Sequence, residues 1–430
     1  MLAENTADAP MTTAARDADH RASFFRQSGW LMIANIGGGV FMWAVHLLNK
    51  FLPGGEYGSF GTFLAVVMVL PTMPLQMIMA QQTARALATG RQGELAGIIR
   101  GVWLWTTLVW LIGAVTVLLL QHQILQAWGM TDPVGLWVTL PVVLLSLWMP
   151  MFWGVQQGQQ GFLWMGWSML ANGIGRITIA TIAVVAFSRY IGGAGGMMIG
   201  VLLGIILAVS IAGWTTRRLW LAHSAPFDWR SLVHQIVPLT LGFLGYQILF
   251  TADTIFVKAY FPDVQDYYVS AGTMARALIW LVAPLASVMF PRLVHSSARG
   301  EKTNLLGLVL LGTAVLGVCG AAGLSIVGPY IVPIIYKGEY ITAVSKLLPW
   351  YAGAMVPLSL ANVLLNNLLA RPSSKLAPAL CVFFLSLCYL VALTKFHASQ
   401  VMVLQTVGVF NVLLLAVCAS FTWRTRASAA

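Results

Sequence analysis

Two arginines lie inside long apolar runs, Arg176 within ANGIGRITIATI and Arg276 within MARALIWLVAP. A charge at the bilayer centre costs at least about 2.5–3.5 kcal/mol on insertion scales, so such residues usually serve a function. The planar guanidinium binds phosphate oxygens through two parallel hydrogen bonds. Both arginines are therefore predicted to bind an anionic substrate such as a diphosphate. The alternative is that either one ties helices together through backbone carbonyls or a polar neighbour such as Asn172.

A carboxylate and an imidazole indicate a second kind of chemistry, the binding and release of a coupling ion. Asp253 is the only carboxylate well within an apolar run, and a carboxylate in such surroundings can exchange a proton or hold Na⁺. His46, near the end of the first run, has a side chain that titrates near neutral pH. Both are predicted to bind H⁺ or Na⁺. The simpler alternatives are an ion pair between Asp253 and Lys258 and an interfacial hydrogen bond for His46.

Neutral polar side chains in the same runs are suited to sugars. Amides and phenols both donate and accept hydrogen bonds, as sugar hydroxyls do. They also suit hydrogen bonding between membrane helices, which contributes about 0.6 kcal/mol per bond. The predicted sugar-binding residues are Asn35, Gln76, Tyr246 and Gln247.

The elements that must position these residues are membrane-spanning helices. Of the 430 residues, 59% are hydrophobic and 9% are charged, and the mean hydropathy is +0.81. Soluble proteins carry about a quarter charged residues, so this chain cannot hide its apolar surface from water in one globule. This composition excludes a soluble enzyme and a disordered scaffold. A nucleic-acid-binding protein is excluded as well, because the basic residues behind the net charge of +11 are scattered between apolar runs.

A spanning helix needs about 20 mainly apolar residues, and twelve such runs occur. They predict an all-α membrane protein with about 12 transmembrane helices in two six-helix lobes. The runs are 29–48, 60–80, 98–120, 134–155, 164–187, 194–214, 233–257, 268–290, 304–326, 347–369, 374–394 and 398–421. The predicted domains are a disordered cytoplasmic tail at 1–28, a lobe at 29–214, a cytoplasmic linker at 215–232, a lobe at 233–421 and a cytoplasmic tail at 422–430.

The basic residues are divided unevenly between the two sides of the membrane. Sixteen Lys and Arg residues fall on the side that holds the amino terminus, six fall on the other side, and two lie inside runs. Because cytoplasmic loops carry the excess of Lys and Arg, both termini are predicted to be cytoplasmic.

An acid and a proline recur 18 residues apart. An acid is stabilised at a helix amino terminus by the helix dipole, and a proline further along permits a kink. Internal repeats are typical of transporters, which bind substrate between the repeats. The four copies are Glu56 with Pro74, Asp132 with Pro150, Asp266 with Pro284, and Glu339 with Pro357. They predict two related lobes with the substrate bound between them.

A membrane enzyme is the alternative from another functional class. The one Asp-x-Asp motif, Asp17 and Asp19, falls in the tail, and the four cysteines lie in apolar runs without metal-ligand spacing. No nucleophile–base constellation is present in the sequence pattern. The sequence therefore predicts no enzyme, no metal and no cofactor beyond a coupling H⁺ or Na⁺.

The stretch from Phe227 to Val294 contains FDWRSLVHQIVPLTLGF, TADTIFVKAYF and DYYVSAGTMARALIWLVAPLASVMFPRL. It resembles the polysaccharide-transporter branch of the multidrug/oligosaccharidyl-lipid/polysaccharide flippase superfamily. EYGSFGTF, QQGFLWMGWSMLANGIGRI and PIIYKGEY are weaker matches in the same order and spacing. Together these segments cover roughly a quarter of the chain.

The resemblance implies an alternating-access flippase with a cavity lined by spans 1, 2, 7 and 8. It would carry an oligosaccharide linked to a polyprenyl diphosphate, of the undecaprenyl type, across a bacterial inner membrane for cell-surface or exopolysaccharide assembly. The implied partners are membrane lipids and a polysaccharide polymerase or ligase, and no nucleic acid. The alternative within the superfamily is a cation-coupled multidrug antiporter, which would depend on Asp253.

One departure from the superfamily bears on the substrate. Its lipid II flippases carry several arginines low in spans 1 and 2 and have two further carboxy-terminal helices. Here the runs 29–48 and 60–80 contain no arginine, and twelve runs are counted. The difference favours a lipid-linked glycan other than the peptidoglycan precursor.

Overall fold

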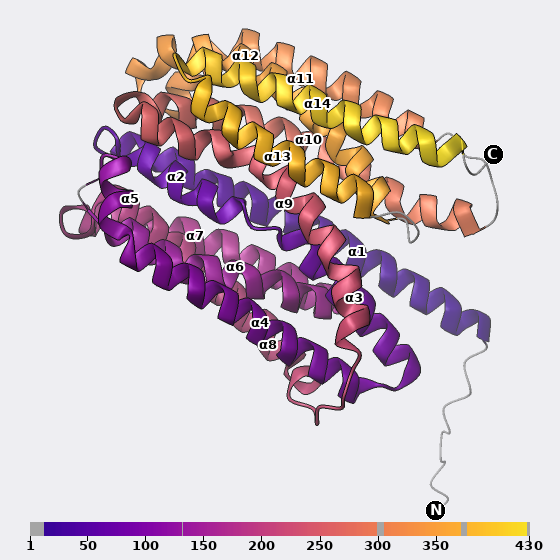
Figure 1. The fold of residues 1–430 in the computed structure, drawn as a ribbon. Helices are drawn as coiled ribbons and strands as arrows, with labels where there is room; N and C mark the ends of the chain where they lie inside the picture. The colour runs from indigo at the N-terminus through magenta and orange to yellow at the C-terminus, as the bar shows by residue number, and fades with distance from the viewer. Residues whose placement is uncertain (1–12, 131, 299–304, 371–375, 428–430) are drawn as a thin grey trace, which may run out of the picture.

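The structure is a computed structural model that describes residues 13–130, 132–298, 305–370 and 376–427. These ranges form α-helices and short 3-10 turns joined by brief connections, and the helices run nearly along one direction (Figure 1). The amino-terminal half comprises α1 (Thr13–Ala44), η1 (Val45–Phe51), α2 (Glu56–Met68), α3 (Thr72–Thr89), α4 (Gln92–Leu119), α5 (Gln121–Ala127), α6 (Val134–Gly158), α7 (Phe162–Ile191) and α8 (Gly193–Trp220). The carboxy-terminal half comprises α9 (Trp229–Tyr260), η2 (Pro262–Val264), α10 (Gln265–Ala298), α11 (Leu305–Ile335), η3 (Gly338–Tyr340), α12 (Ile341–Ala370), α13 (Leu376–Lys395) and α14 (Gln400–Ala427).

The described part of each predicted apolar run is helical, apart from a few end residues and the break between α2 and α3 in run 60–80. Within the described ranges, eleven helical segments are long and apolar enough to cross a membrane. The remaining run, 268–290, lies in α10, some of whose side chains are outside the described residues. The prediction of an all-α membrane protein with about twelve spans is therefore confirmed.

The first helix begins earlier than predicted. Helix α1 starts at Thr13, so the expectation of a disordered tail over 1–28 is wrong from that residue on, while residues 1–12 lie outside the described residues. Between Thr13 and Gly29 the chain has neither glycine nor proline. It is rich in alanine and arginine, which favour helix, so the backbone ladder continues beyond the apolar run.

These extensions change which helices carry arginine. Arg16, Arg21 and Arg26 belong to α1, and Arg85 belongs to α3. The absence of arginine from the first two spans therefore applies to the apolar runs and not to the helices. The apolar run in a sequence identifies only the part of a helix that faces hydrocarbon.

The acids of the repeat stand at helix starts, as predicted. Glu56 is in the first turn of α2 and Asp266 in the first turn of α10. Glu339 lies in η3, immediately before α12. Asp132 Oδ1 accepts a hydrogen bond from the backbone N–H of Val134 at 2.9 Å, where α6 begins.

The second span is broken in mid-membrane. Helix α2 ends at Met68 and α3 begins after Pro71, because proline lacks an N–H and disfavours a helical residue before it. The repeat placed a kink at Pro74, which instead lies in the first turn of α3. The repeat proline Pro284 falls in the part of α10 whose side chains lie outside the described residues.

The helices gather into two groups, α1–α8 and α9–α14 (Figure 1). In the first group α7 packs against α1 and α8, and α6 packs against α3 and α8. In the second group α12 packs against α10, α11 and α14, and α13 packs against α9. The groups meet where α2, α3 and η1 contact α9, α10 and α11.

The two ends of the bundle differ. Helix α1 begins and helix α14 ends at one end of the bundle, which we call the terminal end, to the right in Figure 1. The turns η1 and η3 and the first residues of α2 and α10 lie at the opposite end, which we call the latch end.

The connection between the halves is shorter than the predicted linker 215–232, since α8 continues to Trp220 and α9 begins at Trp229. We call residues 221–228 the strap. Asp228 ends the strap as the amino-terminal cap of α9, and its side chain accepts from the backbone N–H groups of Arg230 and Ser231.

The strap is fixed to α4 along a row of glycines spaced one turn apart, Gly93, Gly97 and Gly101. The backbone N–H of Ala225 donates to the carbonyl of Gly93 at 2.9 Å. The ring of Trp229 lies so close to Gly101 that a Cβ there would overlap it. The strap therefore moves with the amino-terminal half.

Arg100 of α4 adds two hydrogen bonds to this attachment. Its Nε donates to the carbonyl of Trp220 and its Nη2 to the carbonyl of Ala222, both at 2.8 Å. These carbonyls lie at the last residue of α8 and just beyond it, where helix geometry offers them no partner.

Gly101→Leu is expected to destabilise the protein, because the new side chain must displace Trp229. Overpacking of this kind costs about 1–3 kcal/mol. The matched control is Gly113→Leu on the same helix, where a side chain would meet open space. Thermal unfolding in detergent should show a lower midpoint for Gly101→Leu only. Equal midpoints would contradict a tightly packed strap.

Candidate functional site

Two predicted site residues meet in one buried ion pair. Nη2 of Arg276, on α10, lies 2.9 Å from Oδ1 and 3.2 Å from Oδ2 of Asp253, on α9. The arginine side chain is 12% exposed and the aspartate side chain 1% exposed. Because an unpaired charge in the membrane is so costly, each side chain serves as the counter-charge of the other.

The carboxylate of Asp253 is surrounded by phenols. The hydroxyl of Tyr268 donates to Oδ2 at 2.8 Å, and the hydroxyl of Tyr351, on α12, donates to the same oxygen. Both tyrosines are fully buried. The carboxylate therefore joins α9, α10 and α12 at one point.

The guanidinium of Arg276 has further partners. Its Nη2 donates to Oγ1 of Thr254 at 2.8 Å and its Nε to the carbonyl of Phe250 at 3.1 Å. The rings of Phe250 and Tyr351 lie 5.4 and 5.3 Å from the guanidinium carbon, within the range of cation–π attraction.

The two residues predicted to bind an anion (Arg276) and a coupling cation (Asp253) are therefore partners in one ion pair. A diphosphate must replace Asp253 as the partner of Arg276, and a cation must replace Arg276 as the partner of Asp253. Lys258, the expected alternative partner of Asp253, instead donates to Oγ of Ser59 at 3.1 Å. Among the described residues, no three His, Cys, Asp or Glu side chains are placed to share a metal ion.

At the latch end, an acid of one half caps a helix of the other. The carboxylate of Asp266, on α10, accepts from the backbone N–H of Gly55 at 2.9 Å and of Gly58 at 2.6 Å. These N–H groups open α2, and the positive φ of 84° at Gly55 turns the chain into that helix. Tyr340 donates to the same carboxylate at 2.8 Å.

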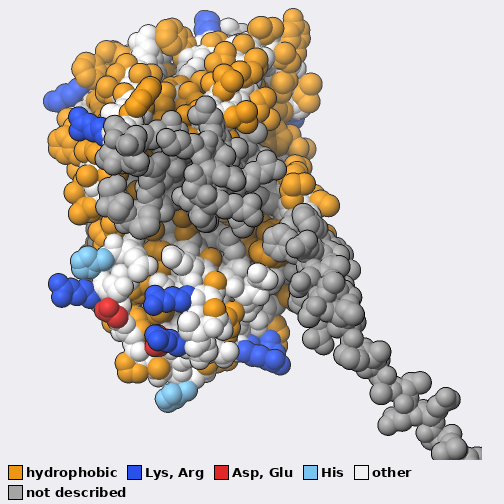
Figure 2. Space-filling view, turned by 90° about the vertical axis from the view of Figure 1, so that its right-hand side faces the viewer, with side chains coloured by type: hydrophobic (Ala, Val, Ile, Leu, Met, Phe, Trp, Pro, Cys, Tyr) orange, Lys and Arg blue, Asp and Glu red, His pale blue; other side chains and the backbone are white. Residues whose placement is uncertain are grey.

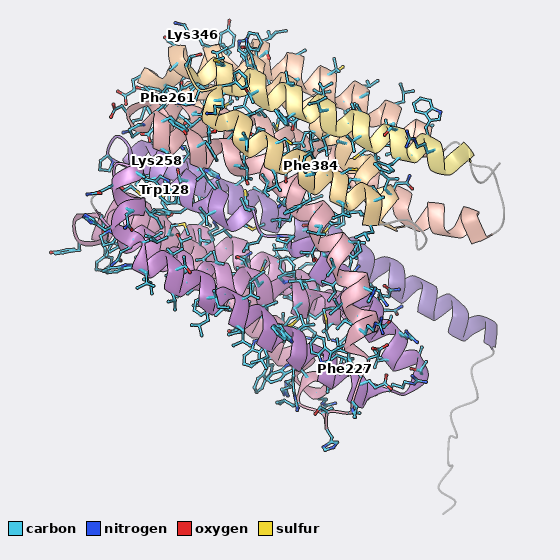
Figure 3. All side chains as sticks on the ribbon, viewed as in Figure 1. Trp128, Phe227, Lys258, Phe261, Lys346 and Phe384 are labelled. Atoms are coloured by element: carbon cyan, nitrogen blue, oxygen red, sulfur yellow. The ribbon has the colours of Figure 1, made fainter. Side chains whose placement is uncertain are left out.

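Further hydrogen bonds join the halves around this cap. Lys258, labelled in Figure 3, reaches Ser59 as described, and Nε2 of Gln265 donates to Oγ1 of Thr62 at 3.2 Å. Nζ of Lys337 donates to the carbonyl of Leu52 at 2.7 Å. We call these residues the interlobe latch: Leu52, Gly55, Gly58, Ser59, Thr62, Lys258, Gln265, Asp266, Lys337 and Tyr340.

Glycines let the backbones approach closely beneath the latch. A Cβ at Gly58 would meet the side chains of Gln265 and Asp266, and a Cβ at Gly61 would overlap Val269. Small residues serve helix packing in membranes in this way. The latch end is therefore closed by both hydrogen bonding and packing.

His46 lies in a second layer of contacts between the halves. Its Nδ1 and the hydroxyl of Tyr57 are hydrogen-bonded at 2.8 Å. That hydroxyl lies 3.4 Å from the hydroxyls of Thr273 and Tyr336 in the other half. Burial raises the pKa of Tyr336 to about 12, so its phenol stays neutral at physiological pH. His46 therefore has a partner on the path between the halves.

One predicted sugar-binding residue lies between the halves, at the break in the second span. Nε2 of Gln247, on α9, donates to the carbonyl of Met68 at 2.7 Å. That carbonyl is at the end of α2, where the helix ladder stops. Gln247 thus stabilises the break and links α9 to the amino-terminal half.

The other predicted residues are not gathered around the ion pair. Asn35 is exposed on α1, and Gln76 of α3 donates to Oε1 of Gln157 at 3.2 Å. Tyr246 is 6% exposed, and its hydroxyl has no hydrogen-bond partner among the described residues. Arg176 lies in α7, in the amino-terminal half.

The tyrosines and Asp266 were not among the predicted site residues. The repeat contained the signal for the latch, because its acids are followed by tyrosine at Tyr57, Tyr267 and Tyr340. Tyr268 and Tyr351 carry no such signal, since a tyrosine in an apolar run reads as ordinary packing.

Asp253→Asn and Arg276→Gln should each lower thermal stability, and the double variant should lose less than the sum. Breaking one side of a buried pair leaves an unpaired charge, at a cost of about 3–5 kcal/mol. A double-mutant cycle from unfolding midpoints in detergent measures the coupling.

The matched control is the exposed pair of Arg91 and Glu94, whose side chains are 60% and 41% exposed. Their Gln variants should be additive within about 0.5 kcal/mol. Additive losses at Asp253 and Arg276 would show that the buried pair is not coupled.

Asp266→Asn should open the latch end, because a neutral amide caps α2 more weakly than a carboxylate does. The reporter is Ala65→Cys, one turn beyond Gly61 on α2 and 3% exposed, in a chain without its native cysteines. Labelling by a membrane-impermeant maleimide should become about tenfold faster, equivalent to about 1.4 kcal/mol. Glu94→Gln is the control acid, and equal rates in both variants would contradict a latch at Asp266.

Comparisons with known proteins agree on the kind of molecule. Residues 95–427 match the family model described as "Lipid II flippase MurJ". The fold resembles a solved structure of lipid II flippase MurJ in an inward closed conformation, with a TM-score of 0.68 and 14% identity over 93% of this chain and 87% of that one.

The fold also resembles multidrug transporters. An inward-facing MATE family transporter of the MOP superfamily gives a TM-score of 0.68 and 13% identity over 91% of this chain and 95% of that one. An outward-facing one gives 0.60 and 15% identity over 94% and 95%. No curated protein sequence matches. The predicted superfamily is confirmed, and the chain belongs to the MurJ lipid II flippase family.

Proposed function

We propose that this protein is an alternating-access flippase for an oligosaccharide linked to a polyprenyl diphosphate, of the undecaprenyl type, in a bacterial inner membrane. The observation that carries the proposal is the family match over residues 95–427. A membrane-spanning fold of two helix groups, joined by breakable bonds at one end, supports it. Cell-surface or exopolysaccharide assembly would use the product, with a polymerase or ligase as partner.

The diphosphate is assigned to Arg276. An arginine held by one carboxylate in a semi-dry site can exchange that partner for a phosphate group, because both anions accept the same forked hydrogen bonds. Tyr268 and Tyr351 would then hold the released Asp253. In the exchange Arg276 keeps an anionic partner, and the two phenols keep the carboxylate of Asp253 hydrogen-bonded.

The sugar is assigned to neutral groups. Gln247 and Gln76 present amides near the break between α2 and α3, and Tyr246 has a free hydroxyl in α9. Asn35 is exposed on α1 beside Met32 and Ile36. These side chains offer donors and acceptors without net charge, as sugar hydroxyls require.

Release of the interlobe latch is the proposed conformational step. In this structure the latch end is closed, so the head group would enter from the terminal end. The polyprenyl tail would stay in lipid between the two groups of helices. Rocking of the halves would break the cap at Asp266 and present the head group at the latch end.

The terminal end is assigned to the cytoplasm. Lys and Arg predominate in the segments predicted to face it, as the positive-inside rule requires. Figure 2 looks onto this end and shows several Lys and Arg side chains there with few acidic ones.

Two candidate substrates, lipid II and another lipid-linked glycan, belong to one chemical class and are tested separately. The apolar runs favour a glycan other than lipid II. The helices of the first two spans nevertheless contain arginine, Arg26 in α1 and Arg85 in α3, as the first two spans of lipid II flippases do. Both candidates share the diphosphate and the polyprenyl tail, so the role of Arg276 is the same for either.

A cation-coupled multidrug antiporter is the weaker alternative. It requires a carboxylate free to bind the coupling ion, whereas Asp253 already holds Arg276, Tyr268 and Tyr351. Coupling of H⁺ or Na⁺ at Asp253 or His46 stays a proposal. It predicts that Asp253→Asn alters the pH or Na⁺ dependence of transport.

The test is movement of the head group in proteoliposomes. A fluorescent undecaprenyl-diphosphate oligosaccharide and a fluorescent lipid II are compared, with head-group exposure followed by an external quencher. The Asp253→Asn, Arg276→Gln double variant should lose at least tenfold in rate, because it keeps the site neutral but removes the phosphate ligand.

The control is Arg230→Gln, an exposed arginine at the start of α9, which should flip at the wild-type rate. Wild-type flipping by the double variant would remove Arg276 from the site. Efflux of cationic dyes without movement of either lipid would overturn the flippase and support the antiporter.

A further inference from the structure

Within the part of the chain that the structure describes, Arg176 is a buried arginine without an ion-pair partner. It lies in α7 and is 9% exposed, and two of its nitrogens, Nε and Nη2, have no hydrogen-bond partner among those residues. Asn172, one turn earlier, directs its amide to the sulfurs of Met42 and Met149 at 3.5 and 3.8 Å. Sulfur is a weak acceptor, so the surroundings of Arg176 are poor in oxygen.

The acids of the described chain are occupied elsewhere or lie at the surface. In the amino-terminal half, Glu56 accepts from the N–H of Ala194, Glu94 pairs with Arg91, and Asp132 caps α6. In the other half, Asp228 caps α9, Asp253 pairs with Arg276, and Asp266 caps α2. The two remaining acids whose side chains are described, Asp263 and Glu339, lie in η2 and η3 at the latch end.

The charge on Arg176 cannot be removed by deprotonation, because a guanidinium keeps its proton in proteins. Buried charges are otherwise paired. An unsatisfied buried group of this kind therefore points to an ion or a water that completes it. Since a water leaves the positive charge uncompensated, an anion from solution fits better.

The packing around Arg176 limits the size of that anion. Helix α8 approaches closely, since a Cβ at Gly200 or Gly204 would overlap the backbone of Arg176. His46 lies near enough for the charge of Arg176 to act on it. Such close packing favours a small ion over a saccharide carrying a polyprenyl tail.

We propose that Arg176 holds a small inorganic anion of the size of chloride in the core of the amino-terminal half. The site is distinct from the ion pair of Asp253 and Arg276, and it does not depend on which substrate is carried. It also bears on the closed state, because His46 is bonded to Tyr57, which contacts Thr273 and Tyr336 across the halves.

The first test is thermal unfolding of purified protein as chloride replaces gluconate at constant ionic strength. Ligands that bind only the folded state raise its stability in a saturable way. Wild-type protein should gain at least about 2 °C and then reach a plateau. Arg176→Gln should lose this response, and the exposed control Arg230→Gln should keep it.

The second test measures how accessible the latch end is, in a chain that keeps Arg176. Maleimide labelling of Ala65→Cys should be several-fold slower in chloride than in gluconate. The proposal is overturned by unfolding midpoints that are equal in chloride and gluconate, or by a chloride response that persists in Arg176→Gln. Neither readout uses flipping, so both results stand apart from the proposed transport.

Discussion

The need to pair every charge within the membrane governs this structure. Asp253 and Arg276 satisfy it together, and the phenols of Tyr268 and Tyr351 complete the carboxylate. Because these residues come from α9, α10 and α12, the pair fixes three helices of the carboxy-terminal half relative to one another. In the proposed flippase the same constraint suits the pair to an anionic head group, which would enter by exchange with Asp253. Stability and the proposed recognition would then depend on one set of atoms.

The latch end uses a different property of helices. The first N–H groups of α2 have no partner within that helix, and the carboxylate of Asp266 supplies one from the other half of the chain. A cap is a local interaction at a helix end, so it can be broken without unfolding either half. Closure by capping and glycine packing therefore suits the two arrangements of the proposed cycle, whereas a large apolar interface would favour only one.

Composition and hydrophobic runs were sufficient to predict the all-helical membrane fold, because the bilayer requires long apolar helices. Helix ends were less predictable, since α1 continues through polar residues to Thr13 and α8 to Trp220. Arg276 and Asp253 were each recognisable as buried charges, but their pairing was not, because 23 residues separate them in sequence. In the sequence, only the repeated acid and the tyrosine that follows it indicated the latch. The repeat does not predict which helices these residues contact.

The strap has a thermodynamic consequence for the cycle. Since residues 221–228 are fixed on the glycine row of α4, almost no free chain separates the halves, and each is held at high effective concentration near the other. Opening the latch end is therefore a unimolecular step with little loss of translational freedom, and closing it requires no encounter. A few hydrogen bonds can then balance the open and closed states closely, which a carrier must do to turn over in both directions.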